Sequence, residues 1–542
     1  MKDIGVLNLS RFGDLIQTTP VLTSLRRRHP GARIHLIVKR RFRSVADMLP
    51  AVDAIHEVNG DALAEALSRP GIAFVDRFRT VREIVDRLAK THFDVLFNFT
   101  HSRASAVLLS LLDTDRRIGF TLDRNGQRRV DSPWPGHMTT VVRARRLSRF
   151  NLVDMYLGAA GVFGSRQPLS VNVPDVAREF AKQRLAGPGP LVAVQLGAST
   201  DTKTWSLDRF AETLHHLTQR IPRTRIVLVG VTDEKPQAEK LKAACPEVRF
   251  EDLVDKTRID ELAAVLESAD LLLTGDTGTM HLAGAVGTTT CGVFVGLGTP
   301  YETGVYAEGH WALMSRIACA PCAHNVKCGH TVCHTDIPSE WLADLLQRIL
   351  EHKPVEGLPP LPRADVLRTR FDEDGLLELV PLHPRQPEPQ DLLAEVYRAA
   401  FLESLEGVPV RPERLWRHAM EHFGIEPQEW RHALPATLPG HLQKLRELGR
   451  RAAEITSLLE QSGMRPTSLQ EHGKTLRETD EAIYAIARAE PLLAPIGLAH
   501  EADLEYLPDA DLPTLASLSS RVYRNLRRRV AVLRELIGAE AS

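Results

Sequence analysis

The fold is indicated most clearly by the segment Ala269-Asp270-Leu271-Leu272-Leu273-Thr274-Gly275-Asp276-Thr277-Gly278-Thr279-Met280-His281-Leu282-Ala283. Its apolar run is typical of a buried strand in a parallel sheet. The strand leads to Asp276, and Thr277 and Gly278 then open a helix whose free backbone N–H groups would face an anion such as a diphosphate. His281 follows one turn inside, on the side that would face a cleft. A lone histidine in an apolar helix is usually a core residue, but this one shares its helix with a phosphate-type turn, so it joins the candidate site.

Similar strand–helix units extend on both sides of this segment. We expect a first series of strands at 4–9, 33–38 and 93–99, and a second series at 191–196, 225–230, 271–274 and 291–295. Strands that alternate with amphipathic helices predict doubly wound parallel sheets. Proline and glycine concentrate between residues 173 and 190, where we expect a hinge between two α/β domains.

Two further turns carry candidate chemistry. Arg11, Gly13 and Asp14 follow the first strand, at the carboxyl end where parallel sheets place their ligands. Asp14 could take the proton of an attacking hydroxyl, or it could simply cap the next helix. In the second series, the small residues from Gln195 to Ser199 would let the backbone approach a phosphate. Lys203 could neutralise that phosphate, or it could be an ordinary surface lysine.

The length of 542 residues suits about three domains. We expect Rossmann-like domains over 1–180 and 185–350, a linker over 351–389 and a helical extension over 390–542. In the extension, apolar residues recur every three or four positions, without the alternation of strands. The predicted fold class is therefore α/β with an all-helical extension, which we expect to pack on the α/β core and to serve assembly or acceptor docking.

Composition is typical of a folded globular protein, with 43% apolar and 25% charged residues. The segment 1–9 is predicted to be a short strand and not a signal peptide. No apolar stretch approaches the roughly 18 residues of a membrane-spanning helix. We therefore expect a cytoplasmic protein.

Charge is unevenly distributed although its net value is only -1. Basic residues crowd 39–43 and 143–149, whereas acids outnumber bases after Glu351. Each basic cluster suits an anionic partner or forms a solvated face. No nucleic-acid recognition motif accompanies the arginines, so we expect no nucleic-acid partner.

Four of the six cysteines lie within one short segment, as Cys319, Cys322, Cys328 and Cys333. Thiols clustered in a cytosolic protein indicate a metal site before disulfides. Four thiolates can form a tetrahedral structural site, with His324, His330 and His334 as spare ligands. A reduced cluster without metal is the alternative.

The motifs together resemble those of the heptosyltransferase family, glycosyltransferase family 9. Order and spacing both match in Gly13-Asp14 with Thr18-Thr19-Pro20, in Gly197 to Trp205, and in Asp276-Thr277-Gly278 with His281-Leu282-Ala283. The resemblance covers roughly residues 1–345. It implies a GT-B fold, in which the N-terminal domain binds the acceptor and the second domain binds a nucleotide sugar.

The resemblance also implies roles and ligands. By the family's pattern Asp14 is the base and Lys203 contacts the diphosphate, and the donor site is completed by Asp276, Thr277, Gly278 and His281. The implied activity is inverting transfer of heptose from ADP-L-glycero-D-manno-heptose or a related nucleotide sugar. No catalytic metal is expected, because helix amides and a lysine would stabilise the leaving diphosphate.

Some features depart from the family's usual pattern. Gln195 stands where many relatives have histidine, and Glu234 is a candidate contact for the ribose or adenine. The cysteine segment resembles that of the autotransporter heptosyltransferases, in which cysteines bind iron, so iron competes with zinc for the predicted site.

The acceptor defines the alternatives. The favoured one is the inner core of lipopolysaccharide, modified by an enzyme peripheral to the inner membrane. A protein hydroxyl on an autotransporter-like acceptor is the close rival, and a nucleotide-sugar epimerase with a GT-B fold is a third hypothesis. The helical extension offers a surface for a homo-oligomer.

Overall fold

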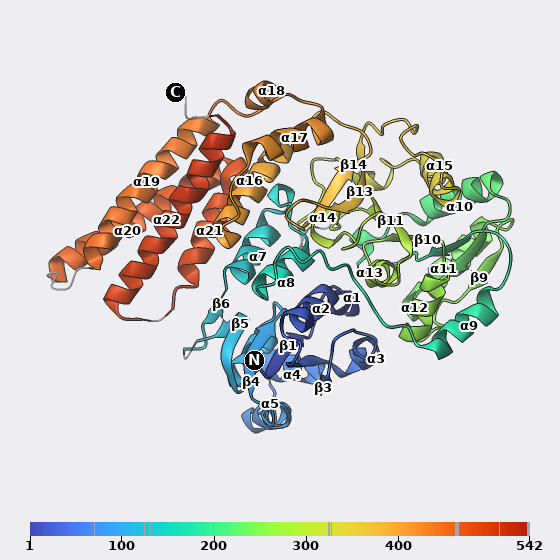
Figure 1. Ribbon diagram of the computed structural model, residues 1–542, viewed down its shortest axis with the longest axis horizontal. Helices are drawn as coiled ribbons and strands as arrows, with labels where there is room; N and C mark the ends of the chain where they lie inside the picture. Colours follow the sequence, from blue (N-terminus) through green and yellow to red (C-terminus); the bar gives the residue numbers. More distant parts are fainter. Residues whose placement is uncertain are drawn as a thin grey trace. The chain divides into compact units, whose positions relative to one another are not determined.

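The computed structural model describes residues 1–69, 71–123, 125–130, 132–198, 200–323, 326, 328–460, 466–508 and 510–538 (Figure 1). The chain forms two compact units. The α/β unit comprises residues 1–100, 112–116 and 150–383, and the helical unit comprises residues 101–111, 117–149 and 384–542. Ser199 and His324, which the sequence analysis named, lie outside the described residues.

The first sheet is built around the N-terminal strand β1 (Asp3–Asn8). This strand is parallel to β2 (Arg33–Lys39) on one side and to β4 (Phe93–Asn98) on the other. Its apolar side chains are fully buried, as expected for a strand covered on both faces. The order is β3-β2-β1-β4-β5-β6, completed by β3 (Ala54–Val58), β5 (Thr114–Leu122) and β6 (Arg128–Val130). The helices between these strands include α1 (Phe12–Ile16), α2 (Thr19–Arg28), α3 (Arg43–Ala46), α4 (Gly60–Ser68) and α5 (Phe74–Leu88).

The second sheet has the order β14-β13-β12-β11-β10-β7-β8-β9 within the described residues. Its parallel part consists of β7 (Leu191–Val194), β8 (Arg225–Leu228), β9 (Phe250–Asp252), β10 (Leu271–Gly275), β11 (Thr289–Phe294) and β12 (Trp311–Ser315). The helices of this part of the chain are α8 (Leu152–Ala159), α9 (Asp175–Leu185), α10 (Leu207–Arg220), α11 (Lys235–Ala244), α12 (Ile259–Glu267), α13 (Gly278–Ala285), α14 (Pro300–Thr303) and α15 (Ser339–Leu350). Both sheets therefore have the doubly wound pattern expected from the sequence.

Two strands lie where the sequence analysis placed only a linker. β13 (Ala364–Phe371) pairs antiparallel with β12, and β14 (Leu377–Pro381) pairs antiparallel with β13. Val366 and Leu367 in β13 and Leu379 in β14 are buried. This hairpin extends the second sheet past residue 350, so the α/β unit reaches His383.

The candidate turns lie where the strand order reverses. In the first sheet β1 separates β2 from β4, and in the second sheet β7 separates β8 from β10. A crevice forms at the carboxyl ends of strands at such a point. Asp14 follows β1, Lys203 follows β7 and Asp276 follows β10. The three predicted turns therefore lie at the carboxyl ends of strands next to the two points where the strand order reverses.

The helical unit contains every element described after Pro389, and all of them are helices, as predicted. They are α16 (Pro389–Glu406), α17 (Pro412–Phe423), α18 (Pro427–His432), α19 (Leu438–Leu459), α20 (Pro466–Ala489), α21 (Ala494–Glu505) and α22 (Leu512–Leu536), with one short 3₁₀ turn. α19 and α22 lie side by side (Figure 1). Along α19 the buried positions alternate in steps of four and three, the spacing of coiled-coil seams: Leu438, Leu442, Leu445, Gly449, Ala452, Thr456 and Leu459. No helix of the described residues is long and apolar enough to cross a membrane.

Part of the N-terminal third belongs to the helical unit, although the sequence analysis assigned it to the first domain. α7 (Pro133–Arg143) packs on α21. Trp134 is buried and its indole N–H donates to Glu406. The ring centroids of His137 and Phe401 are 4.3 Å apart. These side chains complete the core of the helical unit.

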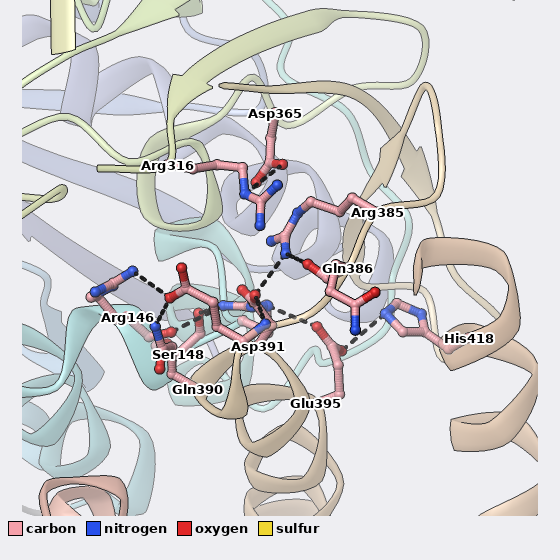
Figure 2. A network of polar contacts seen from close by, with 12 residues as sticks. Arg146, Ser148, Arg316, Asp365, Arg385, Gln386, Gln390, Asp391, Glu395 and His418 are labelled. Carbon is pink, nitrogen blue, oxygen red and sulfur yellow. Dashed lines mark hydrogen bonds and ion pairs between the residues drawn. The ribbon is translucent and has the colours of Figure 1, made fainter. Parts of the chain in front are cut away.

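The basic cluster at 143–149 pairs with acids of the helices. Arg149 is buried, and its Nε donates to Glu395 Oε1 at 2.7 Å. Figure 2 shows Glu395 beside His418, with His418 Nε2 3.2 Å from Glu395 Oε2, and Arg385 beside Asp391. Burial alone would raise the pKa of Glu395, but the charges of His418 and Arg149 hold it well below its usual range. Neither an anionic partner nor a solvated face is therefore needed to explain Arg149.

Candidate functional site

Asp14 lies in α1, on the turn that follows β1. Its backbone carbonyl accepts hydrogen bonds from Asn8 Nδ2 (3.2 Å) and Thr18 Oγ1 (2.8 Å), which hold the turn in place. Its carboxylate Oδ2 accepts from the Arg11 N–H at 3.0 Å. The capping role considered from the sequence is therefore present, and it engages only one carboxylate oxygen. Arg11 itself is exposed beside this turn.

Gly13 and Gly278 bring α1 against the start of α13. A β-carbon on Gly13 would lie 2.9 Å from Gly278 Cα and 3.3 Å from His281 Cδ2. A β-carbon on Gly278 would overlap the ring of Phe12. Because the backbone at Gly278 leaves no room for a β-carbon at position 13, the two predicted turns can approach this closely only with glycine there, whereas a β-carbon at position 278 would require the Phe12 ring to move.

Asp276 is buried and holds Lys203. Lys203 Nζ donates to Asp276 Oδ2 at 2.5 Å. Thr303 Oγ1, from α14, donates to Asp276 Oδ1 at 3.1 Å. Both carboxylate oxygens of Asp276 thus have hydrogen-bond donors. The bond to Oδ2 holds Lys203 Nζ at the carboxyl end of β10.

The start of α13 provides an anion-binding end. Thr277 caps the helix, because its Oγ1 accepts from the Met280 N–H at 3.3 Å. The first N–H groups of a helix have no partner within it, and the helix dipole favours negative charge there. His281 is buried one turn along, and its Nδ1 forms no hydrogen bond with the described residues. An imidazole nitrogen is therefore available beside this end.

Glu234 connects two strand-end loops of the second sheet. It lies at the end of the short 3₁₀ turn after β8, and its carboxylate accepts from Gln195 Nε2 (3.2 Å) and from the Val231 N–H (2.9 Å). Gln195 Oε1 in turn accepts a weak hydrogen bond from Thr277 Oγ1 at 3.5 Å. Glu234 and Gln195 thus link the loop after β8 to the cap of α13.

The electrostatics of the site suit a base and a neutral imidazole. Burial raises the pKa of Asp14 above its ordinary value of 3.8, and the charge of Asp276 adds to the rise, whereas the Arg11 amide and the charges of Arg11 and Lys203 oppose it. A higher pKa makes a carboxylate a better proton acceptor. Burial lowers the pKa of His281 to about 4, so its ring is neutral at neutral pH.

The four clustered cysteines are free thiols with unequal exposure. Cys322 and Cys333 are buried, Cys328 is half-buried and Cys319 is exposed. Burial raises the pKa of Cys333, and the charges of Cys328 and Cys319 contribute, so the three thiols are near one another. No three of these described cysteines have sulfurs within 4.8 Å of one another. Four thiolates suit zinc or iron. The sulfurs would have to move closer together to bind one ion, so the metal stays a prediction.

The cysteine segment also contacts the loops that follow β7 and β11. The Cys322 N–H donates to the Gly296 carbonyl at 2.7 Å, and Trp205 Nε1 donates to the His334 carbonyl at 3.1 Å. Gly296 packs directly on the Thr202 carbonyl, where a β-carbon would not fit. This segment therefore supports the short turn that carries Lys203.

Two neighbours of the site were not predicted from the sequence. Thr303 binds Asp276, and Tyr156 is buried near Asp14, whose charge adds to the effect of burial in raising the pKa of Tyr156. Neither residue belongs to a strand-end turn, and nothing in the sequence pattern distinguished them.

Comparisons with known proteins are consistent with this geometry. Residues 81–331 match the family model of glycosyltransferase family 9 (heptosyltransferase). Lipopolysaccharide heptosyltransferase 3 of Escherichia coli K12 is 22% identical over 290 residues, which are 52% of this chain and 79% of that protein. Lipopolysaccharide heptosyltransferase 1 of Pseudomonas aeruginosa is 26% identical over 326 residues, which are 58% of this chain and 85% of that protein.

A solved structure supports the fold. The glycosyltransferase family 9 protein of Veillonella parvula has a TM-score of 0.52 at 18% identity, covering 65% of this chain and 98% of that one. The likeness confirms the predicted GT-B fold of two Rossmann-like domains. Fold, strand-end turns and family match together define a glycosyltransferase. Over residues 81–331 the chain is similar to the heptosyltransferase family, glycosyltransferase family 9.

Proposed function

We propose that this enzyme transfers heptose from ADP-L-glycero-D-manno-heptose to a hydroxyl of the lipopolysaccharide inner core, with inversion at the anomeric carbon. The names of the relatives support the sugar and the acceptor class. One observation carries the proposal. The contact of Gly13 with Gly278 brings the turn that carries the half-buried Asp14 to the start of α13, whose first N–H groups suit an anion.

The proposed reaction is a single displacement. Asp14 takes the proton of the acceptor hydroxyl as its oxygen attacks the anomeric carbon. The bond from that carbon to the diphosphate oxygen breaks, and ADP leaves from the opposite face, so the configuration inverts. Lys203 and the first amides of α13 stabilise the negative charge that develops on the diphosphate. These groups supply the stabilisation, and we therefore expect no catalytic metal.

The remaining residues bind and position the substrates in this proposal. Thr277 and Gly278 form the anion end of α13, Asp276 holds Lys203 in place, and the neutral ring of His281 contacts the donor. Glu234 shapes the nucleoside side through Gln195. On the acceptor side, Arg11 is exposed next to the base, and Gly13 lets α1 pack closely on the start of α13.

A thermal-shift screen against nucleotides tests the donor. A ligand at 100 times its dissociation constant stabilises the folded state by about 2.7 kcal/mol. We expect ADP and ADP-heptose to raise the melting temperature, UDP and GDP sugars to raise it less, and Lys203→Ala to reduce the effect of ADP. The assigned donor site would be refuted if ADP raised the melting temperatures of the wild type and of Lys203→Ala equally. It would also be refuted if ADP did not raise the melting temperature of the wild type.

The acceptor needs a separate assay. Purified inner-core saccharide and a serine-rich autotransporter passenger would be offered with the same donor. Heptosylation of the saccharide alone is the expected result. Modification of the passenger alone would replace the proposed acceptor, and release of nucleotide without any acceptor would indicate an epimerase.

A further inference from the structure

Helix α5 exposes a cluster of large apolar side chains. Phe74, Val75 and Phe78 are 78%, 61% and 54% exposed. No other described helix exposes three such side chains within one turn and a half. Ordinary surfaces carry single exposed apolar residues, whereas a contiguous cluster indicates an interaction surface.

The cluster exists because only half of the helix packs on the fold. Ile84 and Leu88, in the second half of α5, are its buried residues. Phe74 and Phe78 are four positions apart, and their rings stack at a centroid distance of 6.3 Å. The first half thus presents an aromatic face that no described part of the chain covers. Figure 1 shows α5 at the rim of the first sheet.

Two arginines, each paired with an acid of the same helix, lie beside this aromatic face. The Arg82 guanidinium lies over the Phe78 ring at 5.9 Å, and Arg79 is one turn from Val75. Arg79 and Arg82 contact Asp76 and Asp86 only through pairs exposed by more than half, and such exposed pairs are weak. Both guanidiniums are therefore available to a partner. The positive end of the helix dipole lies at the same end, where Ala73 provides no side-chain cap and Asp76 stands in the first turn.

We propose that the first half of α5 docks on an anionic phospholipid surface. Aromatic rings would enter the boundary between headgroups and acyl chains, while the arginines and the helix N-terminus contact phosphates, as interfacial helices do. The proposal does not depend on the reaction described above, although it would bring the enzyme to a lipid-linked acceptor.

Vesicle flotation tests this surface with the full-length protein. We expect the wild type to float with vesicles that contain phosphatidylglycerol and to bind phosphatidylcholine vesicles less. Phe74→Ser/Phe78→Ser should weaken binding about tenfold or more, since each phenylalanine would no longer be buried. Arg79→Gln/Arg82→Gln should weaken binding to the anionic vesicles and reduce its sensitivity to salt.

Matched controls separate the surface from general effects. Val176→Ser removes another highly exposed side chain, 69% exposed on α9, and Arg87→Gln removes a cation of the second half of α5. Both controls should bind like the wild type, and circular dichroism should show that every variant is folded. A wild type that does not float, or a phenylalanine variant that floats equally well, would overturn the proposal. Wild-type dimers that this variant dissociates would assign the face to a second copy instead.

Discussion

Gly13 and Gly278 lie so close that a β-carbon on Gly13 would be 2.9 Å from the Gly278 Cα atom. Backbone cannot yield locally as a flexible side chain can, so Gly13→Ala should separate α1 from α13. We expect kcat/KM for transfer to fall by about 100-fold, the usual effect of misplacing a reacting group by about 1 Å. The affinity for ADP should change little.

Gly31→Ala is the matched control for this change. Gly31 lies in the same domain as Gly13, and no atom lies within 4 Å of the β-carbon that this substitution would add. Steady-state kinetics should therefore distinguish the two alanine variants. Wild-type kcat/KM in Gly13→Ala would show that the close approach is not needed for transfer.

Lys203 and Asp276 should behave as a coupled pair. Lys203→Met leaves the buried Asp276 carboxylate without its cation, and we expect the free energy of unfolding to fall by about 1–3 kcal/mol. Adding Asp276→Asn should recover most of that stability, because no unpaired charge remains. ADP binding, measured by calorimetry, should stay weak in both. If the double variant binds ADP as the wild type does, the lysine has no donor role.

The positions of the site turns could be predicted because they follow from local pattern. Short apolar runs such as Leu191–Val194 and Leu271–Gly275 form parallel strands, and such strands place their following turns at one edge of a sheet. The family resemblance assigned Asp276 and Lys203 to one donor site, so these two residues were expected near each other. Thr303 was not, because its contact with Asp276 depends on how a separate loop packs.

Long-range pairing explains what the sequence analysis could not predict. The sequence shows that the cluster at 143–149 is positively charged. It does not show that the partner of Arg149 is Glu395, 246 residues away. The Pro-rich stretch before Ala364 was consistent with a linker, and only its pairing with β12 shows that residues 364–371 form a strand. Neither relationship produces a local periodicity.

The cysteine segment should bind about one zinc or iron ion per chain after anaerobic purification, as a four-thiolate site requires. Cys319→Ser/Cys322→Ser should lose the ion and lower the melting temperature. Cys245→Ala, which changes a buried cysteine outside the cluster, should keep it. Mass spectrometry of the metal content decides the question, and a metal-free wild type would favour four reduced thiols.

Transfer should depend on pH through Asp14. A general base acts only when deprotonated, and burial raises the pKa of Asp14 above 3.8. Activity should therefore be lost as the pH falls, at a higher pH than for an exposed aspartate. His281, with a pKa of about 4, stays neutral near pH 7 and adds no second step there. A kcat/KM that is flat across the acid range, while circular dichroism shows folded protein, would contradict this assignment.

The most direct test compares the wild type with Asp14→Asn. Since the folded state holds the Asp14 proton more tightly, the contribution of this carboxylate to stability falls as the pH rises through its raised pKa. Asparagine avoids that penalty and can still accept from the Arg11 N–H, so we expect an unfolding midpoint at neutral pH that is unchanged or higher. Formation of heptosylated inner-core saccharide from ADP-heptose would be followed by mass spectrometry. The wild type should form the product, and Asp14→Asn should form it about 10² to 10⁴ times more slowly with ADP affinity retained; near-normal turnover by Asp14→Asn would contradict the proposed role of Asp14 as the base.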